Sequence, residues 1–241
     1  MMNLKKQIDI AVICEPSCQS LLEIINDLVF NIKNINPDLN IQVHYVLNHI
    51  SISHCILCKE CFKTSFCKLD TIDRFDNAKQ IIEVSDLVII GSPVLGNNVS
   101  GIIKTFIDRT SYWMHLMNLI GKTAIICVSA KNTGYNDVVK YLYEVCSNFG
   151  LTVIGVICKT SMVGQKELKA RQNQIIRNFM DIYSLNLNIL GNMYLRDSYR
   201  MYRDNFAWIP KDKVTFENTY WIKRKKYENL DLFLSEFYES Q

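Results

Sequence analysis

Apolar runs of strand length alternate with longer segments of helical periodicity along most of this chain of 241 residues. The apolar residues are nearly continuous at residues 86–91 (DLVIIG), whereas at residues 19–33 they recur every three or four positions. Continuous apolar strands are typical of a parallel sheet covered by helices on both faces. We therefore predict an α/β chain built on a doubly wound, five-stranded parallel sheet. The predicted strands are residues 7–14, 41–47, 86–91, 123–129 and 152–158, and the predicted helices are residues 19–33, 73–84, 100–117, 136–148 and 167–183.

The loops at the carboxyl ends of the central strands are the expected ligand site. In doubly wound sheets, ligands bind outside these strand ends, where the strand order reverses. The loops to consider follow the first, third and fourth predicted strands, at residues 15–20, 92–98 and 130–136. The first loop holds Ser17 and Ser20, whose hydroxyls suit a phosphate at the start of the following helix. The sequence carries neither a P-loop nor a dinucleotide-binding fingerprint.

Four cysteines lie close together in the segment CILCKECFKTSFC at residues 55–67. This C-x2-C-x2-C-x5-C run brings four thiolates into one short loop, and short spacers keep the entropic cost of loop closure low. The spacing suits a [4Fe–4S] cluster with all four cysteines as ligands. A structural zinc site and a metal-free loop are the alternatives, although zinc sites more often use two separate C-x2-C pairs. The candidate ligands are Cys55, Cys58, Cys61 and Cys67.

The composition narrows the function classes. Apolar residues make up 49% and charged residues 21% of the chain, which is typical of a globular protein with a sizeable core. The net charge of +3 is too small to indicate nucleic acid or an anionic membrane as a partner. Nine cysteines without a secretory signal indicate a reducing compartment, and no apolar stretch reaches membrane-spanning length. We expect a soluble, cytoplasmic protein with no nucleic-acid or membrane partner.

The region from residue 50 to residue 110 carries several motifs that occur together in one family. After the cysteine run come Asp70, a predicted helix leading into SDLVIIGSPV, a turn that ends NNVSG and the helical segment IIKTFIDR. With these motifs the chain resembles the iron–sulfur flavoproteins, a branch of the flavodoxin-like NAD(P)H-dependent FMN reductase family. The resemblance implies a flavodoxin-like domain over residues 1–188, with FMN as its cofactor.

The resemblance also implies which residues border the flavin. In this family the S-P-V turn and the K-x-x-[IF]-D-R helix lie beside the flavin, and they correspond here to residues 92–94 and 104–109. An alternative for Asp108 and Arg109 is a local ion pair that anchors their helix. The full set of expected flavin-binding residues is Ser17, Ser20, Ser92, Pro93, Val94, Leu95, Asn97, Asn132, Thr133, Gly134 and Tyr135, with Lys104, Asp108 and Arg109 beside them.

The expected function is that of an FMN-dependent oxidoreductase or electron-transfer flavoprotein, with the [4Fe–4S] cluster as a one-electron relay. NAD(P)H or a ferredoxin would supply the electrons, and the resemblance implies a homodimer or higher homo-oligomer. A second hypothesis is a flavodoxin-like scaffold that has lost FMN and acts as a non-catalytic partner subunit. It rests on residues 14–20, where the expected phosphate loop is short, lacks glycine and holds Glu15 near the site of a dianion.

The segment at residues 189–241 differs from the rest, because it is dense in aromatic residues and in charges of alternating sign. We expect two or three helices that pack on the core, on a partner subunit or over the ligand pocket. The basic run at residues 223–226 is followed closely by acidic residues, so it indicates a solvated helix face rather than a nucleic-acid-binding patch.

Overall fold

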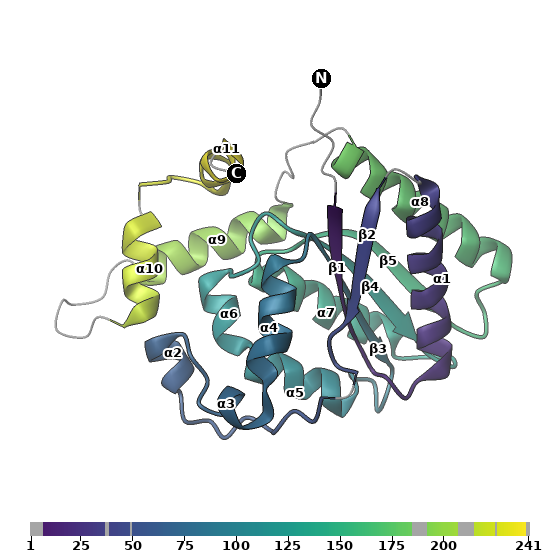
Figure 1. Ribbon diagram of the computed structural model, residues 1–241, viewed down its shortest axis with the longest axis horizontal. Coiled ribbons are helices and arrows are strands. Elements are labelled where there is room, and N and C mark those ends of the chain that lie inside the picture. Colours follow the sequence, from purple (N-terminus) through teal and green to yellow (C-terminus); the bar gives the residue numbers. More distant parts are fainter. Residues whose placement is uncertain are drawn as a thin grey trace.

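A computed structural model of the chain shows a parallel sheet with helices on both faces and a helical extension (Figure 1). The strand order is β2-β1-β3-β4-β5, and every neighbouring pair is parallel. This is the predicted flavodoxin-like arrangement, in which the order reverses between β1 and β3. The strands are β1 (Gln7–Cys14), β2 (Asn40–Tyr45), β3 (Leu87–Pro93), β4 (Thr123–Ser129) and β5 (Thr152–Lys159). The structure describes residues 7–36, 39–48, 50–184, 192–206, 215–224 and 226–239.

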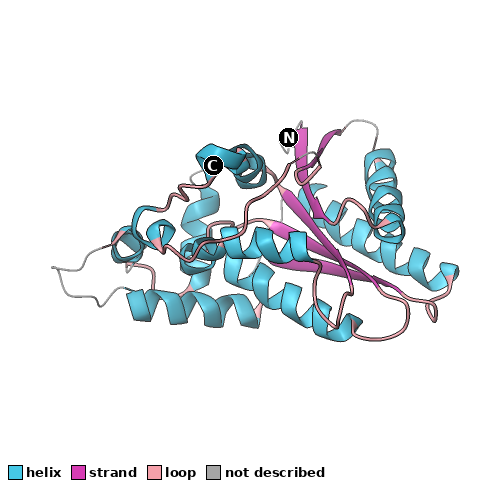
Figure 2. Ribbon diagram, turned by 90° about the horizontal axis from the view of Figure 1, so that it is seen from below, coloured by secondary structure: helices cyan, strands magenta, loops and turns pink. Residues whose placement is uncertain are grey.

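Two layers of helices cover the two faces of the sheet (Figures 1 and 2). One face packs against α1 (Gln19–Ile35) and α8 (Gln165–Ser184). The other face packs against α4 (Phe75–Val84), α5 (Gly101–Arg109) and α7 (Tyr135–Phe149). Because both sides of β3 and β4 are buried in this way, their sequences are apolar almost throughout.

The predicted elements agree with the structure in most places. All five predicted strands are confirmed to within two residues at each end, and so are the predicted helices that correspond to α1, α4, α7 and α8. The periodicity of apolar residues therefore located the sheet and most of its covering helices correctly.

One predicted helix, at residues 100–117, is wrong in its length. Helix α5 ends at Arg109, and a second helix, α6 (Ser111–Leu116), begins after Thr110. Thr110 has a φ of −109°, and its hydroxyl donates a hydrogen bond to the carbonyl oxygen of Phe106 at 2.8 Å. A threonine hydroxyl that bonds back to the preceding turn competes with the backbone bonds of the helix and bends it. The apolar periodicity continues across this break, so the sequence pattern does not show where the helix ends.

The cysteine segment contains a helix of its own rather than only a loop. The short helix α2 (Glu60–Thr64) lies within it, and α3 (Asp70–Asp73) follows the last cysteine. Lys59 precedes α2 and Ser65 follows it, and both have left-handed φ values, of 60° and 59°. Helices of one turn are too short to show the periodicity that sequence analysis detects.

The extension packs against the flavodoxin-like domain through its aromatic residues. These residues form a cluster around Trp221 that also includes Met117 and Ile120, which lie between α6 and β4. Figure 1 shows α10 beside α2, and residues of these two helices are in contact. The described helices of the extension are α9 (Met193–Phe206), α10 (Phe216–Arg224) and α11 (Leu230–Glu239).

The predicted boundary between residues 188 and 189 lies outside the described residues, because the structure describes nothing between residues 184 and 192. Within the described chain, none of the helices combines the length and the apolar character needed to cross a membrane.

Candidate functional site

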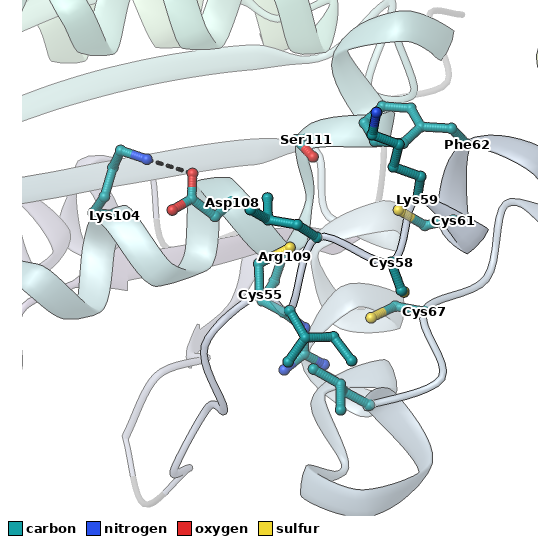
Figure 3. Close-up of a pocket in the computed structure, with 13 residues that line it drawn as sticks. Cys55, Cys58, Lys59, Cys61, Phe62, Cys67, Lys104, Asp108, Arg109 and Ser111 are labelled. Carbon is teal, nitrogen blue, oxygen red and sulfur yellow. Dashed lines mark hydrogen bonds and ion pairs between the residues drawn. The ribbon is translucent and has the colours of Figure 1, made fainter.

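Four cysteine thiols line one cavity beside helix α5 (Figure 3). The cavity has a volume of about 480 Å³, and Cys55, Cys58, Cys61 and Cys67 all belong to its wall. The structure thus brings all four predicted ligands to one place. The other lining residues are Ile56, Leu57, Lys59, Phe62, Leu69, Lys104, Asp108, Arg109 and Ser111.

The backbone of the cysteine loop alternates in handedness. Leu57 and Lys59 have left-handed φ values of 55° and 60°, while Cys58 between them does not. Such an alternation turns successive N–H groups to one side and forms a concavity for anions, which recurs at iron–sulfur sites. No described residue accepts a hydrogen bond from the N–H groups of residues 56–59. These amides are therefore available to an anion held by the loop.

Buried ion pairs hold the cysteine loop in place. The side chain of Arg109 is fully buried, and its Nη2 donates to Asp70 at 2.6 Å. Its Nη1 donates to Asp73 at 2.6 Å and to the carbonyl oxygen of Ser53 at 2.8 Å. Lys79 completes the group by donating to Asp70 at 2.7 Å. Two cations thus balance two carboxylates, and pairing of this kind makes their burial tolerable. We call these four charged residues the buried quartet.

The wall of the cysteine cavity combines buried thiols with two cations. Burial, followed by the closeness of the other three thiols, raises the pKa of Cys61 to about 11. Positive charge comes from Arg109 and from Lys104, which forms an ion pair with Asp108 at the half-exposed rim. Burial alone would lower the pKa of Lys104, but its pairing with Asp108 outweighs burial and raises that pKa. Both side chains are thus permanent cations beside the thiols.

The arrangement of the thiols bears on which metal group they fit. Among the described residues, no three His, Cys, Asp or Glu side chains stand close enough together to hold a metal ion. A zinc ion would require its thiolate sulfurs within about 2.3 Å of one point. In a [4Fe–4S] cluster each thiolate bonds a different iron, so the four sulfurs stand farther apart around a larger volume. Four thiols around one cavity supply the donor atoms that either group requires.

A second cavity, of about 510 Å³, lies at the carboxyl ends of β3, β4 and β5. Ser20 in the first turn of α1 and Ser129 at the end of β4 both line it, and their hydroxyl groups are hydrogen-bonded to each other at 2.6 Å. This is the edge of the sheet at which the topology predicts a ligand. The lining residues are Cys18, Ser20, Pro93, Val94, Ser129, Ala130, Lys131, Lys159, Thr160 and Ser161.

The start of α1 suits a phosphate group in the second cavity. Cys18 precedes the helix with extended backbone and no side-chain cap, and the first turn holds no acidic residue. The free N–H groups of such a helix start attract anions. Ser17 is directed elsewhere, because its hydroxyl donates to the carboxylate of Glu15 at 2.6 Å. The residues present therefore fit a phosphate through Ser20 and the helix start rather than through Ser17.

The turn after β3 packs on the loop after β4. Leu95 and Asn98 exchange two backbone hydrogen bonds of 2.9 and 3.0 Å, which close a tight turn. Gly134 has a φ of +79°, and a Cβ atom at this position would lie 2.5 Å from Oδ1 of Asn97. Only glycine permits this approach, so the packing of the two loops depends on it.

The predicted flavin-binding residues divide into three groups. Ser20, Pro93 and Val94 line the second cavity. Ser92 is buried and supports the turn, because its hydroxyl accepts the N–H of Ser100 at 2.9 Å and donates to the carbonyl oxygen of Pro93 at 2.8 Å. The remaining residues lie outside the lining of this cavity, namely Ser17, Leu95, Asn97, Asn132, Thr133, Gly134 and Tyr135.

Sequence analysis did not include four residues that line the second cavity. They are Ser129 at the end of β4 and the polar run Lys159, Thr160 and Ser161 at the end of β5. The sequence analysis considered only the loops after the first, third and fourth predicted strands, near the switch point in strand order. It therefore left out the loop after β5, which is an edge strand. The polar residues directly after the apolar strand β5 could have indicated that this strand end also borders a ligand site.

The helix residues that the resemblance places beside the flavin line the cysteine cavity. These are Lys104, Asp108 and Arg109, and the suggested ion pair between the last two is wrong. Neighbouring positions on a helix point in different directions, whereas Lys104 and Asp108 are one turn apart and face each other. Arg109 reaches the carboxylates of α3 instead.

Comparison with known proteins gives sequence relatives for the central part of the chain. An iron–sulfur flavoprotein of Clostridioides difficile is 28% identical over 133 residues, which are 55% of this chain and 58% of the relative. An iron–sulfur flavoprotein of Archaeoglobus fulgidus is 33% identical over 129 residues, which are 50% of this chain and 58% of the relative. The match thus spans little more than half the length of each relative.

Solved structures share the fold at low sequence identity. The apo form of the NADH:FMN oxidoreductase EMOB has a TM-score of 0.53 and 15% identity, and the match covers 77% of this chain and 96% of that one. RosB, solved with a bound riboflavin-phosphate intermediate, has a TM-score of 0.52 and 13% identity, with 92% of this chain and 88% of that one covered.

The family model for NADPH-dependent FMN reductases matches residues 29–162, which is more than half of the chain. This region contains the cysteine segment and most of the strand ends that form the second cavity. The match and the two sequence relatives agree with the resemblance read from the motifs. The chain therefore belongs to the NADPH-dependent FMN reductase family.

Proposed function

We propose that this protein is an FMN-dependent oxidoreductase whose cysteine loop holds a [4Fe–4S] cluster. The observation that carries the proposal is the convergence of Cys55, Cys58, Cys61 and Cys67 on one cavity, in a chain of the FMN reductase family. The names of the sequence relatives, iron–sulfur flavoproteins, support both cofactors.

The second cavity is the proposed FMN site. Ser20, Ser129 and the start of α1 would hold the phosphate, and Pro93 and Val94 would border the ring system. Bound FMN supplies hydride and one-electron chemistry, so the protein itself needs no acid or base in this step. Its residues would bind and orient the cofactor.

The cysteine cavity is the proposed cluster site. The four thiolates would be the ligands, and the free N–H groups of residues 56–59 would donate to sulfur atoms. Lys104 and Arg109 would lie beside the thiolates, each already paired with carboxylates. Helix α5 borders this cavity, and it begins just after the turn from β3 that borders the second cavity, so one element links the two sites.

We further propose NAD(P)H or a ferredoxin as the electron donor and a homodimer or higher homo-oligomer as the assembly. The family model, which is that of NADPH-dependent enzymes, supports a small-molecule donor. A cytoplasmic location is supported by the nine cysteines, which are all free of disulfide bonds.

One observation favours a second candidate, a flavodoxin-like scaffold without FMN that serves as a partner subunit. The carboxylate of Glu15 takes hydrogen bonds from both the hydroxyl and the N–H of Ser17, at 2.6 and 3.3 Å. In a phosphate loop these donors would serve the phosphate, and the carboxylate would repel it. An FMN titration of the purified protein separates the two candidates, because the scaffold would not bind FMN.

The test of the proposed function is a cofactor analysis of protein purified without air. Iron, acid-labile sulfide, zinc and FMN are assayed on one sample, for the natural protein and for Cys58→Ser and Cys18→Ser. The proposal expects about four iron and four sulfide per chain with bound FMN. Cys58→Ser should lose the iron, and Cys18→Ser, outside the cysteine cavity, should keep it. Stoichiometric zinc, or iron content that Cys58→Ser leaves unchanged, would contradict the cluster assignment.

A further inference from the structure

We infer that the Nε–H of Arg109 is a hydrogen-bond donor to the sulfur atoms of the group held in the cysteine cavity, and that it raises the reduction potential of that group. This inference rests on the proposed function, and it concerns one N–H group that no protein acceptor uses. Arg109 thereby acts as a positioning and tuning residue of the cysteine site.

The hydrogen bonds of Arg109 leave one donor over. A guanidinium group carries five N–H groups. The two terminal nitrogens donate to Asp70, Asp73 and the carbonyl oxygen of Ser53, in four hydrogen bonds of 2.6 to 3.3 Å. No described residue accepts a hydrogen bond from Nε, although this atom is buried. The fifth donor is therefore without a protein partner.

An unpaired buried N–H group is unusual enough to require an explanation. Most buried donors in native proteins have an acceptor, because the loss of water is otherwise not compensated. The Arg109 side chain is 0% exposed, so bulk water does not replace the missing acceptor. A group bound in the adjoining cavity would supply the acceptor.

The cysteine cavity is the place where this acceptor would sit. Arg109 lines the cavity together with all four cysteines (Figure 3). Among the lining residues it is the one arginine, and the closeness of Cys67 is among the influences that raise its pKa. Thiolate and sulfide sulfur atoms accept hydrogen bonds, and such bonds to a cluster tune its reduction potential.

Because of the buried quartet, Arg109 would act on the bound group through its Nε–H hydrogen bond rather than through its positive charge. Arg109 and Lys79 are matched by Asp70 and Asp73, so the quartet as a whole is neutral. What the quartet leaves unused is one N–H dipole, on a residue that lines the cavity. It stabilises the more negative, reduced state of a bound cluster more than the oxidised state, so the reduction potential rises.

A purely structural role is the alternative. Arg109 fixes the carbonyl oxygen of Ser53, two residues before Cys55, and it joins α5 to α3. If that were its whole role, variants of Arg109 would lose stability and cluster content. The remaining clusters would nevertheless keep their spectrum and potential. A direct readout of the contact is therefore required.

The direct experiment is pulsed EPR (HYSCORE) on the reduced holoprotein labelled with [15N]arginine. We expect a 15N coupling between the cluster and one arginine nitrogen, which disappears in Arg109→Lys. A cluster signal without 15N coupling in the natural protein would overturn this inference and leave the proposed function intact. The absence of any iron–sulfur signal, with no iron bound, would overturn the proposed function and this inference with it.

Redox titration of two variants gives the second test. Arg109→Lys keeps a positive charge but removes Nε–H, and it should lower the ratio of reduced to oxidised cluster at a fixed potential about tenfold, which is about 59 mV for one electron. Asp73→Asn disturbs the same network but keeps Nε–H, so its potential should stay or shift in the positive direction. Equal potentials for the natural protein and Arg109→Lys would overturn the inference.

Discussion

Trp221 donates its indole N–H to the carbonyl oxygen of His115 at 2.6 Å, and this bond joins the extension to helix α6. His115 also bonds Glu217 of α10, with its Nδ1 3.0 Å from the carboxylate oxygen. On its other side, the His115 ring lies 4.8 Å from the ring of Phe62 in α2. The extension, the domain and the helix that carries Cys61 therefore meet at one histidine.

Replacing Trp221 with alanine should destabilise the protein by about 3–5 kcal/mol, because a large aromatic side chain is lost from the core. Trp221 is 1% exposed and is in ring contact with Tyr199 and Tyr202. Denaturant unfolding measures the change. Ile222→Ala, on the exposed side of the same helix, is the matched control and should change stability by less than about 0.5 kcal/mol. Equal losses for the two variants would show that the extension does not pack as described.

Replacing Glu15 with alanine should tighten FMN binding. The change frees the hydroxyl and the N–H of Ser17 and removes a negative charge next to the proposed phosphate site. A hydrogen bond to a charged group contributes about 1.5 kcal/mol or more, so we expect affinity to rise about tenfold. Quenching of FMN fluorescence measures the dissociation constant. Glu236→Gln, which removes the same charge in the extension, should leave it unchanged, and equal effects of both variants would contradict the local explanation.

Replacing Gly134 with alanine should weaken both the folded state and FMN binding. The added Cβ would collide with Oδ1 of Asn97, and φ is +79°, which alone costs about 1–2 kcal/mol for a residue with a side chain. Thermal unfolding and the FMN titration report the two effects. Gly101→Ala is the control, since nothing lies within 4 Å of a Cβ there and its φ is not left-handed. A Gly134→Ala variant as stable as the control would refute the described contact between the two loops.

Replacing Asp73 with asparagine should change the acid dependence of stability. Burial alone would raise the pKa of Asp73, but hydrogen bonds from Arg109 and from the N–H groups of Ser53 and Phe75 outweigh it, so the pKa lies below its ordinary value. The ionised carboxylate therefore stabilises the folded state above about pH 4, and this contribution is lost as the pH falls through the lowered pKa.

Unfolding free energies between pH 7 and pH 3 measure this effect. At pH 7 the variant should be less stable by about 3–5 kcal/mol, because Arg109 loses a buried partner. The difference should shrink in acid. Parallel stability curves for the natural protein and Asp73→Asn would contradict this assignment.

The fold was predictable because the buried strands are runs of apolar residues in the sequence. β3 and β4 are covered on both sides, and their apolar runs show it directly. The break at Thr110 was not predictable, because it depends on a side-chain hydrogen bond that leaves the apolar periodicity unchanged. The bounds of the one-turn helices α2 and α3 were beyond reach because such short helices show no periodicity.

The two sites differed in how much the sequence revealed. The grouping of the four cysteines follows from spacing alone, because all four lie in one short segment and line one cavity. The partners of Arg109 do not, since Asp70 and Asp73 precede it by 39 and 36 residues and only the packing of α3 against α5 joins them. Ser129 and Lys159 become neighbours through strand pairing, which residue types cannot show.

The buried quartet limits how far the cysteine segment can be treated as a transferable module. Its members lie on α3, α4 and α5, outside residues 55–67, yet they fix the backbone from which those residues emerge. A graft of the thirteen residues into another flavodoxin-like scaffold would carry the ligands without their framework. A transplanted segment would therefore need Asp70, Asp73, Lys79 and Arg109 with it to keep the shape of its backbone.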